Sequence, residues 1–496
     1  NWWLLNLTKF FIDQHGCAKN QVDGELLIGY LLDAGYEQTF APEQADVIII
    51  NSCGFIESAK KESIDALCAA KKSYPNAKIV LAGCLAERYA QTFKDALPEA
   101  DGIFGNGKLE KINETVQAVL KGNRPVNVYK QEGICTGERR VMLSYRGSAF
   151  VKITEGCSNH CSFCAIPVIR GELRSRPAKS IISEIESLLE QGIVEFNLIG
   201  QDLAAYGTGE NDNVFGNGRA ELPLWIDGKN CGTENKSALA LLLEKILEIK
   251  KNFIVRLLYI HPDHFNRDIL PIMQKDARIV PYFDIPFQSG DEEIIRKMNR
   301  KGSAEEYLKL ASDIRCALPN AVLRTTFLTG FPGETEQNAE NTFDFLKKLQ
   351  SDWSGCFPYS REEDTPAYSM KNRVSAKVSK ARAEKLTSEQ EKITEQHLKK
   401  YIGKEFDVLI EEIVEGEEGL AIGRAWFQAP DVDGSVVVRY QKDSKTENDL
   451  VKLGRFVRVK ICSSSAVDLD GILVSDSNFS NGFINNSKLV FAPEVQ

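Results

Sequence analysis

One stretch of nine residues, 156–164 (GCSNHCSFC), contains three cysteines at Cys-x3-Cys-x2-Cys spacing: Cys157, Cys161 and Cys164. Residues 150–153 before it alternate apolar and polar side chains, which predicts a strand. The cysteines therefore leave a strand end together and can converge on one centre. Thiolates favour zinc or iron–sulfur clusters. A structural zinc site usually has four protein ligands, so zinc would need His160 as well, whereas a cluster held by three cysteines keeps one iron free for a small molecule.

The N-terminal part of the chain alternates strands with helices. Strands are predicted over 9–12, 46–50 and 78–82, with one helix entered near Asp23 and a second over 58–72. This βαβαβ order predicts a doubly wound parallel sheet. Residues 108–148 are expected to connect this domain to the rest of the chain.

A second group of cysteines follows these strands: Cys17, Cys53 and Cys84. In a parallel sheet the carboxyl ends of the strands share one edge, where ligand sites form. A single cysteine at a strand end is more often a buried small residue, but all three strands end this way, which favours a cluster site. Gly16 and Gly83 precede two of the thiols and permit unusual backbone angles in tight loops.

A second series of strands and helices begins at residue 149. After the strand at 150–153, five more are predicted over 194–199, 255–260, 281–285, 322–328 and near 355–357. Six strands alternating with helices predict a partial βα barrel, which carries its chemistry after the carboxyl ends of its strands. Cofactor contacts are expected at the polar residues and glycines found there: Gln201, Asp202, Gln288, Ser289 and the turn 330–334. Three arginines after the cysteine stretch either meet carboxylates or stay solvated: Arg170, Arg174 and Arg176.

Three further segments depart from this alternation. Residues 208–236 are rich in Gly, Asn and charge, which indicates an untethered insertion or a lid, and Cys231 within them is not expected to be a ligand. Residues 371–402 are charged and periodic, as in a solvated helix or linker. After Gly403, short strands predict a small antiparallel barrel of the oligonucleotide-binding type.

The C-terminal barrel is acidic. From Gly403 to Gln496 the chain has 10 Lys or Arg and 16 Asp or Glu, which gives a net charge of −6. Such a surface would repel RNA and attract a basic protein, so residues such as Asp431 and Asp433 are expected to face a basic partner. The net charge of the whole chain, −9, also disfavours a nucleic acid as its main partner.

Composition predicts a cytoplasmic globular protein. Twelve cysteines in a chain of 496 residues suggest metal binding or catalysis before disulfides. No apolar run reaches ~18 residues, so no membrane-spanning helix is expected. The apolar residues 1–5 lack a basic leader and a small-residue cleavage site, so no signal peptide is expected.

The cysteine stretch resembles the signature of radical S-adenosylmethionine enzymes, Cys-x3-Cys-x-aromatic-Cys, with Phe163 as the aromatic residue. Nearly the whole chain resembles the methylthiotransferases, which have an N-terminal three-cysteine domain, a radical core with a six-stranded partial barrel, and a C-terminal TRAM barrel. On this resemblance the three domains are expected at 7–125, 143–375 and 403–480, with a charged helical linker at 376–402.

One branch of that family modifies adenosine in tRNA, and the other modifies an aspartate in small-subunit ribosomal protein S-twelve. Five motifs look like the ribosomal-protein branch: GCAKN at 16–20, NSCGFIE at 51–57, CAIP at 164–167, FPYS at 357–360 and APDVDG at 429–434. The tRNA branch tends to differ at these places. A tRNA-modifying enzyme and a non-catalytic metal scaffold are the two alternatives to this interpretation.

The resemblance also implies cofactors and a reaction. It implies a 4Fe–4S cluster held by three cysteines, Cys157, Cys161 and Cys164. The open iron of this cluster would bind S-adenosylmethionine, and one electron would cleave the cofactor to release a 5′-deoxyadenosyl radical. It implies a second 4Fe–4S cluster that carries the sulfur to be transferred, on Cys17, Cys53 and Cys84. A second S-adenosylmethionine would supply the methyl group, and the product would be a 3-methylthio-aspartyl residue. An electron donor that the sequence does not identify is required, whereas no membrane or DNA partner is expected.

Overall fold

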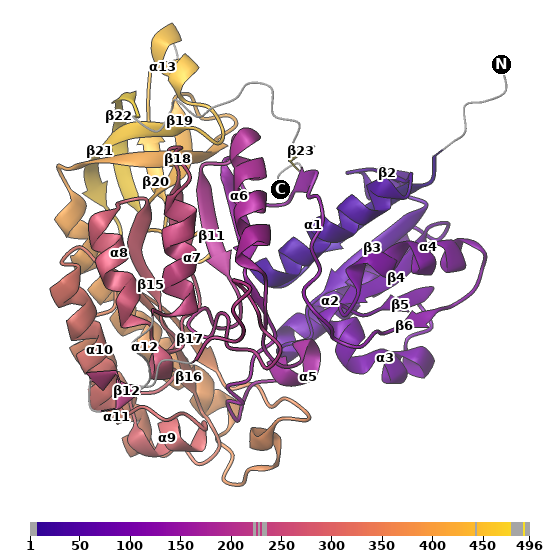
Figure 1. Ribbon diagram of the computed structural model, residues 1–496, viewed down its shortest axis with the longest axis horizontal. Helices are drawn as coiled ribbons and strands as arrows, with labels where there is room; N and C mark the ends of the chain where they lie inside the picture. The colour runs from indigo at the N-terminus through magenta and orange to yellow at the C-terminus, as the bar shows by residue number, and fades with distance from the viewer. Residues whose placement is uncertain are drawn as a thin grey trace.

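Two six-stranded parallel sheets and one closed barrel follow each other along the chain (Figure 1). They are seen in a computed structural model that describes residues 7–221, 225–226, 229–230, 236–441, 444–477 and 490–491. The predicted α/β fold, with a doubly wound sheet, a partial barrel and a small C-terminal barrel, is confirmed. None of the helices in these ranges is both long enough and apolar enough to cross a membrane.

The N-terminal sheet has the strand order β2-β1-β3-β4-β5-β6, and its neighbouring strands are parallel. Its strands are β1 (Lys9–Gln14), β2 (Glu37–Gln38), β3 (Val47–Ser52), β4 (Lys78–Gly83), β5 (Gly102–Phe104) and β6 (Val126–Asn127). The helices are α1 (Ala18–Asp33), η1 (Pro42–Gln44), α2 (Glu57–Ser73), α3 (Cys84–Ala96), η2 (Leu109–Lys111) and α4 (Ile112–Leu120). All residues of β3 are buried, as expected of a strand covered on both faces.

Two features of this domain differ from the prediction. Helix α1 begins at Ala18, directly after Cys17, rather than near Asp23. The chain from 108 to 148 is more than a connector, because it contains α4 and the edge strand β6. β5 and β6 are only three and two residues long, which is too short for an alternation of apolar and polar residues to be recognised.

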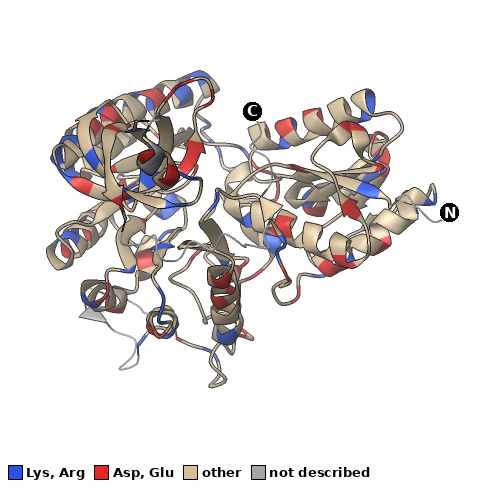
Figure 2. Cartoon of the chain, turned by 90° about the horizontal axis from the view of Figure 1, so that it is seen from above, with Lys and Arg blue, Asp and Glu red and all other residues tan. Residues whose placement is uncertain are grey.

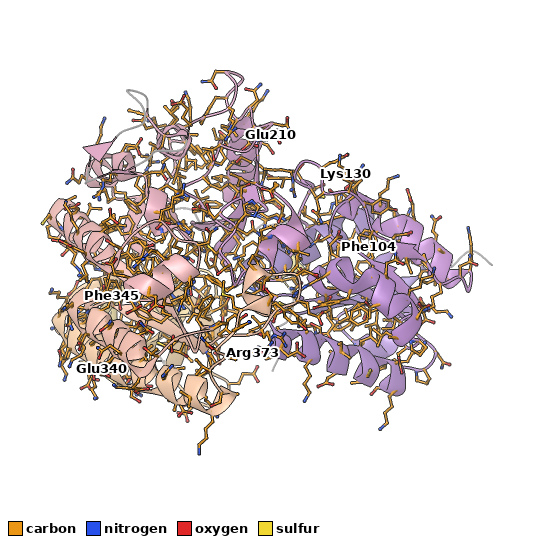
Figure 3. All side chains as sticks on the ribbon, turned by 90° about the horizontal axis from the view of Figure 1, so that it is seen from below. Phe104, Lys130, Glu210, Glu340, Phe345 and Arg373 are labelled. Atoms are coloured by element: carbon orange, nitrogen blue, oxygen red, sulfur yellow. The ribbon has the colours of Figure 1, made fainter. Side chains whose placement is uncertain are left out.

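The central sheet has the order β17-β16-β15-β14-β11-β8 and is also parallel, which confirms the six-stranded partial barrel. Its strands are β8 (Ser148–Lys152), β11 (Glu195–Ile199), β14 (Ile254–Leu257), β15 (Ile279–Asp284), β16 (Val322–Thr329) and β17 (Trp353–Pro358). Its helices are α5 (Ile166–Arg170), α6 (Ala178–Glu190), α7 (Ala238–Leu247), η3 (Pro262–His264), η4 (Arg267–Ile269), α8 (Leu270–Lys275), α9 (Glu292–Lys297), α10 (Ala304–Ala317), α11 (Glu336–Leu349) and η5 (Pro366–Ser369). Phe345 of α11 packs edge-on against Phe287 and Phe327 in the core beneath these helices (Figure 3).

Three two-stranded ribbons accompany the sheets: β9 (Thr154–Glu155) with β10 (Arg174–Ser175), β12 (Trp225–Ile226) with β13 (Lys229–Asn230), and β7 (Val141–Met142) with β23 (Val490–Phe491). The first part of the segment 208–236 is anchored rather than untethered. The buried Asp212 carboxylate accepts hydrogen bonds from the backbone N–H of Ser175 (2.9 Å) and Gly209 (2.8 Å). Cys231 lies outside the described residues.

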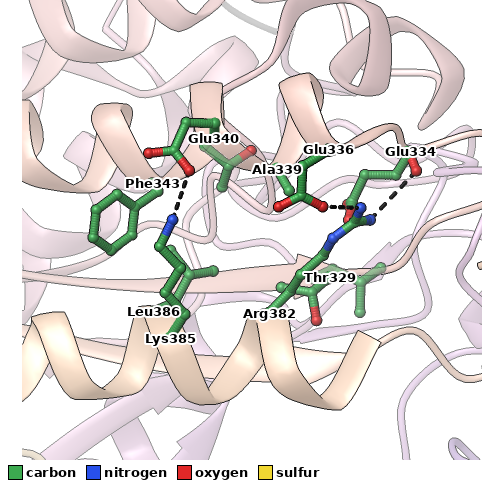
Figure 4. Close-up of a pocket in the computed structure, with 11 residues that line it drawn as sticks. Thr329, Glu334, Glu336, Ala339, Glu340, Phe343, Arg382, Lys385 and Leu386 are labelled. Atoms are coloured by element: carbon green, nitrogen blue, oxygen red, sulfur yellow. Dashed lines mark hydrogen bonds and ion pairs between the residues drawn. The ribbon is translucent and has the colours of Figure 1, made fainter. Parts of the chain in front are cut away.

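Helix α12 (Ala376–Leu398), followed by η6 (Lys399–Tyr401), is not a solvated linker. It packs along α11, where Arg382 binds Glu334 (2.7 Å) and Glu336 (2.9 Å), and Lys385 binds Glu340 (2.6 Å), beside a narrow crevice (Figure 4). Its buried face consists largely of small or polar residues: Ser379, Ala383, Leu386, Gln390, Ile393, Thr394 and Leu398. The helix therefore belongs to the helical layer of the partial barrel.

The C-terminal barrel closes in the order β18-β19-β20-β22-β21. Its elements are β18 (Glu405–Ile413), β19 (Leu420–Ala425), β20 (Val436–Arg439), α13 (Lys445–Leu450), β21 (Phe456–Ser464) and β22 (Leu469–Asp476). The predicted strands are present, but β22 was not predicted, and the barrel is not wholly antiparallel because β20 and β22 pair in parallel.

The C-terminal barrel is joined to the central sheet through buried charges, which lie near the amino ends of the strands of the central sheet. Arg424 of β19 binds Glu411 (2.5 Å) within the barrel and Glu195 (2.8 Å), the first residue of β11. Arg256 binds Glu195 from the other side (2.6 Å). In Figure 1 the yellow barrel accordingly lies at one end of the central domain, and α5 lies toward the other end.

A second contact in the same interface overturns one expectation. The side chain of Asp433 is fully buried and accepts a hydrogen bond from the Tyr282 hydroxyl (2.6 Å), and its other oxygen lies 3.3 Å from the Arg324 Nε. Asp433 therefore does not face a partner. Its charge and that of Glu411 are used inside the molecule, so the acidity counted from the sequence overstates the acidity of the surface.

The N-terminal domain is attached along the central domain by further buried ion pairs. Glu25 of α1 binds Arg139 (2.7 Å). Lys60 of α2 and Arg88 of α3 both bind Glu362, in the loop after β17, at 3.1 and 2.7 Å. Acidic and basic residues are otherwise interspersed over both parts of the molecule (Figure 2).

Candidate functional site

The carboxyl ends of β1, β3 and β4 bring three thiols to one edge of the N-terminal sheet: Cys17, Cys53 and Cys84. The three strands are neighbours, and Ser52 is in register with Gly83, so the cysteines that follow these two residues begin side by side. The Cys53 Sγ also lies against the loop that carries Cys17, because a Cβ atom added to Gly16 would be 3.3 Å from it. The structure thus brings the predicted N-terminal cysteines together.

Two buried asparagines hold these loops in place. The Asn20 amide donates to the carbonyl oxygens of His15 (2.8 Å) and Asn51 (3.1 Å), and the Asn51 amide donates to the Gln14 Oε1 (2.8 Å) and the Asn20 carbonyl (2.8 Å). Gly83 has φ +89°, and a Cβ there would lie 2.6 Å from the Asn51 Oδ1. The expectation that glycine is needed before the thiol is confirmed at this position.

The second triad lies in the loop after β8 and β9. Cys161 is buried, and Cys157 and Cys164 are partly exposed. The loop is fixed by backbone hydrogen bonds, among them Cys157 N–H to Gly171 O (3.1 Å) and Cys164 N–H to Cys161 O (3.0 Å). Burial raises the pKa of Cys164 to about 12 and raises that of Cys157 as well. Such thiols ionise when a metal centre replaces the proton, so the donor set suits a metal cluster.

The zinc alternative with His160 as a fourth ligand has no support in the geometry. The His160 side chain is 57% exposed and lies 3.5 Å from the Glu172 Oε1. Throughout the described part of the chain, no three Cys, His, Asp or Glu side chains converge closely enough to hold a single metal ion. A 4Fe–4S cluster is larger than one ion and takes thiols that are farther apart.

Arg170 links the two triads across the domain boundary. It lies at the end of α5, just after the second triad, and its Nη2 is 3.1 Å from the Sγ of Cys84 in the first triad. The same guanidinium binds Asp23 of α1 (2.8 Å) and Glu155 of β9 (2.8 Å). Lys152 binds both of these carboxylates, so two cations and two anions form a closed buried network.

Lys19 lies in the first turn of α1, two residues after Cys17. Its Nζ is 3.5 Å from the centroid of the Tyr259 ring, which belongs to the central domain. The surrounding protein acts to raise the pKa of Cys17, although this residue is exposed at the surface, and the Lys19 charge and then the Arg170 charge outweigh that effect and lower the pKa. The Lys19 charge also acts on Cys164, where it opposes the rise caused by burial. Lys19 therefore lies within electrostatic reach of both triads.

Asp202, predicted at a cofactor-contact position, supports the cysteine loop. Its carboxylate forms hydrogen bonds with the His264 Nε2 (2.5 Å), the Asn159 amide (2.8 Å) and the His261 backbone N–H (3.1 Å). The His261 ring stacks on His264, and its Nε2 lies 3.8 Å from the Cys161 Sγ. Asp202 thus fixes the side chains that border the second triad.

The other predicted contact positions divide into two kinds. Ser289 bonds to the Thr342 hydroxyl (3.1 Å), and Glu334 accepts from the Gly330 N–H (2.9 Å) and from Arg382 (2.7 Å), so both are held by the protein. The Oε1 of Gln201 is buried and forms no hydrogen bond within the described residues. Gln201 therefore offers an unused acceptor at the carboxyl end of β11.

The three arginines after the cysteine stretch also divide. Arg170 and Arg176 meet carboxylates, the latter at Glu184 (2.5 Å), whereas Arg174 donates to backbone oxygens such as Gly133 O (2.6 Å). No role was predicted for Lys19 or Asn20. The only signal for them was their place in the GCAKN motif beside Cys17.

Three parts of the chain match known protein families. Residues 9–105 match the uncharacterized protein family UPF0004, residues 151–346 match the radical SAM superfamily, and residues 402–474 match the TRAM domain. A solved structure of similar fold is the radical S-adenosylmethionine methyltransferase TsrM from Kitasatospora setae, determined with cobalamin and a [4Fe-4S] cluster bound. It has 15% sequence identity and a TM-score of 0.50, and the match covers 73% of this chain and 76% of TsrM.

Curated relatives match along nearly the full chain. The ribosomal protein uS12 methylthiotransferase RimO of Treponema denticola is 50% identical over 480 residues, which cover 93% of this chain and 100% of the relative. The RimO of Natranaerobius thermophilus is 35% identical, over 93% of this chain and 98% of that protein. Identity at this level over almost the whole length, with both cysteine triads in place, shows that the chain belongs to the RimO family of ribosomal protein uS12 methylthiotransferases.

Proposed function

We propose that this chain methylthiolates the β-carbon of an aspartate in ribosomal protein uS12, the small-subunit protein S-twelve. The observation that carries the proposal is the meeting of two cysteine triads across one domain boundary, with Arg170 bonded to Cys84 (3.1 Å). One triad suffices for radical chemistry, and a second beside it provides a place from which sulfur can be delivered. The names of the relatives support uS12 as the substrate.

The chain is a radical S-adenosylmethionine enzyme and uses a 4Fe–4S cluster and S-adenosylmethionine. We assign the cluster that binds S-adenosylmethionine to three thiols: Cys157, Cys161 and Cys164. We assign a second 4Fe–4S cluster to the N-terminal thiols: Cys17, Cys53 and Cys84. All six are free of disulfides, and the unused Gln201 acceptor suits a donor group of the cofactor. When bound, the cluster and S-adenosylmethionine supply the abstraction of hydrogen from an unactivated C–H bond.

The residues of the chain have separate tasks around these groups. Arg170 holds the Cys84 thiol, Asn20 holds the segment before Cys53 through the Asn51 carbonyl, and Asp202 holds the loop of the second triad through Asn159. The buried network of Asp23 with Lys152 and Arg170 fixes the distance between the two domains. These contacts hold the two sets of thiols in a fixed relation to each other.

The N-terminal domain was expected at 7–125, and we extend it to 127 because β6 (Val126–Asn127) belongs to its sheet. We assign the radical core to 143–375 and the TRAM barrel to 403–480, of which 478–480 lie outside the described residues. The helix at 376–402 is grouped with the radical core because it packs on α11. The basic protein uS12 remains the proposed partner, although fewer acidic groups face outward than the net charge of −6 suggests. We propose a cytoplasmic location and no membrane or DNA partner. The reaction also requires an electron donor.

Two experiments test this function. Anaerobically reconstituted protein should hold about two 4Fe–4S clusters per chain, by the number of thiolate triads, and iron and sulfide analysis that gives one cluster would overturn the N-terminal assignment. The purified enzyme should then be offered uS12 and unmodified tRNA in parallel, and both should be weighed by mass spectrometry. Methylthiolation of tRNA alone would transfer the chain to the tRNA-modifying branch, and no product on either would favour a scaffold.

The two triads can be separated by single substitutions. Cys161→Ala should abolish the formation of 5′-deoxyadenosine, because it removes a ligand of the S-adenosylmethionine cluster. Cys53→Ala should leave some cleavage of S-adenosylmethionine but no methylthio product, because it removes a ligand of the sulfur site. If both variants cleave the cofactor like the parent protein, the division of roles is wrong.

A further inference from the structure

His261 directs one ring nitrogen at a thiol of the second triad. It follows β14 and is buried, and its Nε2 lies 3.8 Å from the Cys161 Sγ, a hydrogen-bond distance for an atom as large as sulfur. Its Nδ1 accepts a hydrogen bond from the backbone N–H of Asp263 (3.3 Å). Pro262 has no N–H, so Asp263 supplies the first N–H of η3, and the His261 side chain caps it.

This cap determines which ring nitrogen of His261 carries the proton. A neutral imidazole has one N–H donor and one acceptor nitrogen, whereas a charged imidazole has no acceptor. Because Nδ1 accepts from Asp263, the ring is neutral and its single proton is on Nε2. The bond between the ring and Cys161 therefore runs in one direction, with Nε2–H as the donor and the sulfur as the acceptor.

The orientation of the His261 ring is set by contacts outside the triad. The ring lies parallel to that of His264, with the centroids 4.9 Å apart and an angle of 3° between the planes. Asp202 holds both residues, because one of its oxygens bonds to the His264 Nε2 (2.5 Å) and the other accepts the His261 backbone N–H (3.1 Å). The Nε2–H thus keeps its direction through contacts that do not depend on Cys161.

A hydrogen bond to a cluster ligand affects how readily the cluster accepts an electron. Hydrogen bonds to the sulfurs are among the features that set the reduction potential of an iron–sulfur cluster. The added electron increases the negative charge on the sulfurs, so an N–H donor stabilises the reduced state more than the oxidised state. The buried Arg300 also hydrogen-bonds to the Cys161 thiol. The effect of the neutral His261 donor must therefore be separated from the effect of this charge.

We propose that His261 is a positioning residue whose Nε2–H, bonded to Cys161, raises the reduction potential of the cluster that binds S-adenosylmethionine. This inference rests on the proposed function, which assigns that cluster to Cys157, Cys161 and Cys164. The cluster gains one electron from the one-electron donor that the reaction requires, and that donor is oxidised. The proton stays on Nε2 in both redox states, and no bond of the histidine forms or breaks.

The test measures this potential in the full-length chain. Cys53→Ala is the background, because it removes a ligand of the N-terminal cluster and leaves one cluster to titrate. Reconstituted protein is titrated in the presence of redox mediators, and the reduced cluster is quantified by electron paramagnetic resonance. At a fixed applied potential, His261→Leu should lower the ratio of reduced to oxidised cluster about tenfold, which is ~59 mV for a one-electron couple and the order expected for one hydrogen bond to a charged group.

Two further variants separate the N–H donor from the shape of the side chain. His261→Gln carries an amide nitrogen at the same number of bonds from Cβ as the histidine Nε2, so it should recover most of the potential. His397→Leu is the matched control and should leave the potential unchanged. His397 also bonds to a buried carboxylate, that of Asp352 (3.0 Å), but this contact lies beside the amino end of β17.

A second measurement requires no substitution at the triad. When histidine is labelled with the heavy isotope of nitrogen, pulsed electron paramagnetic resonance of the reduced cluster should detect a weak coupling to a histidine nitrogen. The coupling should be absent in His261→Gln and present in His397→Leu.

The outcomes separate this inference from the proposed function. An unchanged potential in His261→Leu with an intact cluster refutes the role of His261 and leaves the proposed function standing. An equal decrease in His261→Leu and His261→Gln does the same, because the shape of the side chain would then be the cause. If His261→Leu holds no cluster, the absence of the histidine coupling in the parent refutes the inference. If Cys161→Ala holds as much iron and sulfide as the background protein, no cluster lies on these thiols and both proposals fail.

Discussion

The substitution Arg424→Met tests whether the C-terminal barrel is an integral part of the central domain. Arg424 donates to Glu411 from Nε (2.7 Å) and from Nη2 (2.5 Å), to Glu195 from Nη2 (2.8 Å), and to the Gln428 carbonyl from Nη1 (2.9 Å). Its side chain is 3% exposed. Methionine has a similar length and no charge, so it preserves packing and removes only these bonds.

The magnitude follows from the groups that would be left behind. Glu195 would retain Arg256 (2.6 Å), but Glu411 would lose its cation and remain buried. Breaking a buried ion pair by removing one partner costs about 3–5 kcal/mol. At about 2–4 °C per kcal/mol for a domain of ~150–250 residues, the unfolding midpoint should fall by roughly 6–20 °C.

Differential scanning calorimetry of the parent and of the variant measures this change. Arg439→Met is the control, because its ion pair with Asp470 lies on the exposed face of the same barrel (3.2 Å, 62% and 38% exposed) and should contribute at most about 1 kcal/mol. A decrease for Arg424→Met no larger than for Arg439→Met would refute the claim that the barrel is held by buried charge. Arg424→Met combined with Glu411→Leu should recover part of the loss, since no lone buried charge remains there.

Three further outcomes are expected. Glu195 should make the stability of the protein depend on pH. Burial acts to raise the pKa of Glu195, but Arg424 and Arg256 lower it overall. Its contribution to stability is therefore present above about pH 4.3, is lost as the pH falls through the lower pKa of the folded state, and should be absent in Glu195→Gln. Arg170→Met should lower the iron and sulfide bound at the N-terminal triad to about half of the parent content or less, whereas a full complement would contradict its support of Cys84. Glu362→Ala should increase hydrogen exchange in α2 by about tenfold or more, because Lys60 and Arg88 would lose their buried carboxylate partner at a cost of over about 1.4 kcal/mol. Unchanged exchange would show that the Glu362 ion pairs do not hold α2 in place.

The sequence was sufficient to predict the three longest strands of the N-terminal sheet, the six strands of the central sheet and the position of the cysteines after them, for a physical reason. A buried parallel strand such as β3 is a continuous apolar run, and the residue that follows such a run lies at the carboxyl edge whatever the rest of the chain does. Cys53 and Cys84 could therefore be assigned to one edge without a structure. The arrival of Arg170 at Cys84 could not, because it depends on how two separately folded domains meet.

Two errors have a similar cause. Helix α12 was expected to be solvated because its buried face includes Ser379, Gln390 and Thr394, which have no apolar periodicity and pack by hydrogen bonding, for example from Gln390 to the Ser351 carbonyl (2.8 Å). Asp433 was expected at the surface because a count of charges contains no information about burial. In both places polar residues satisfy each other inside the molecule, which composition alone cannot distinguish from contact with water.

The interface between the C-terminal barrel and the central sheet has a consequence for the exchange of domains between relatives. Half of that interface is encoded far upstream of the barrel, by Glu195, Arg256 and Arg324. A hybrid enzyme made by splicing a foreign barrel after Ile402 would inherit only the downstream half, and a truncation at the same point would leave Glu195 and Arg256 facing solvent. Successful hybrids should be those that transplant the upstream positions together with the barrel, and substitutions on the two sides of this interface are expected to be inherited as a set.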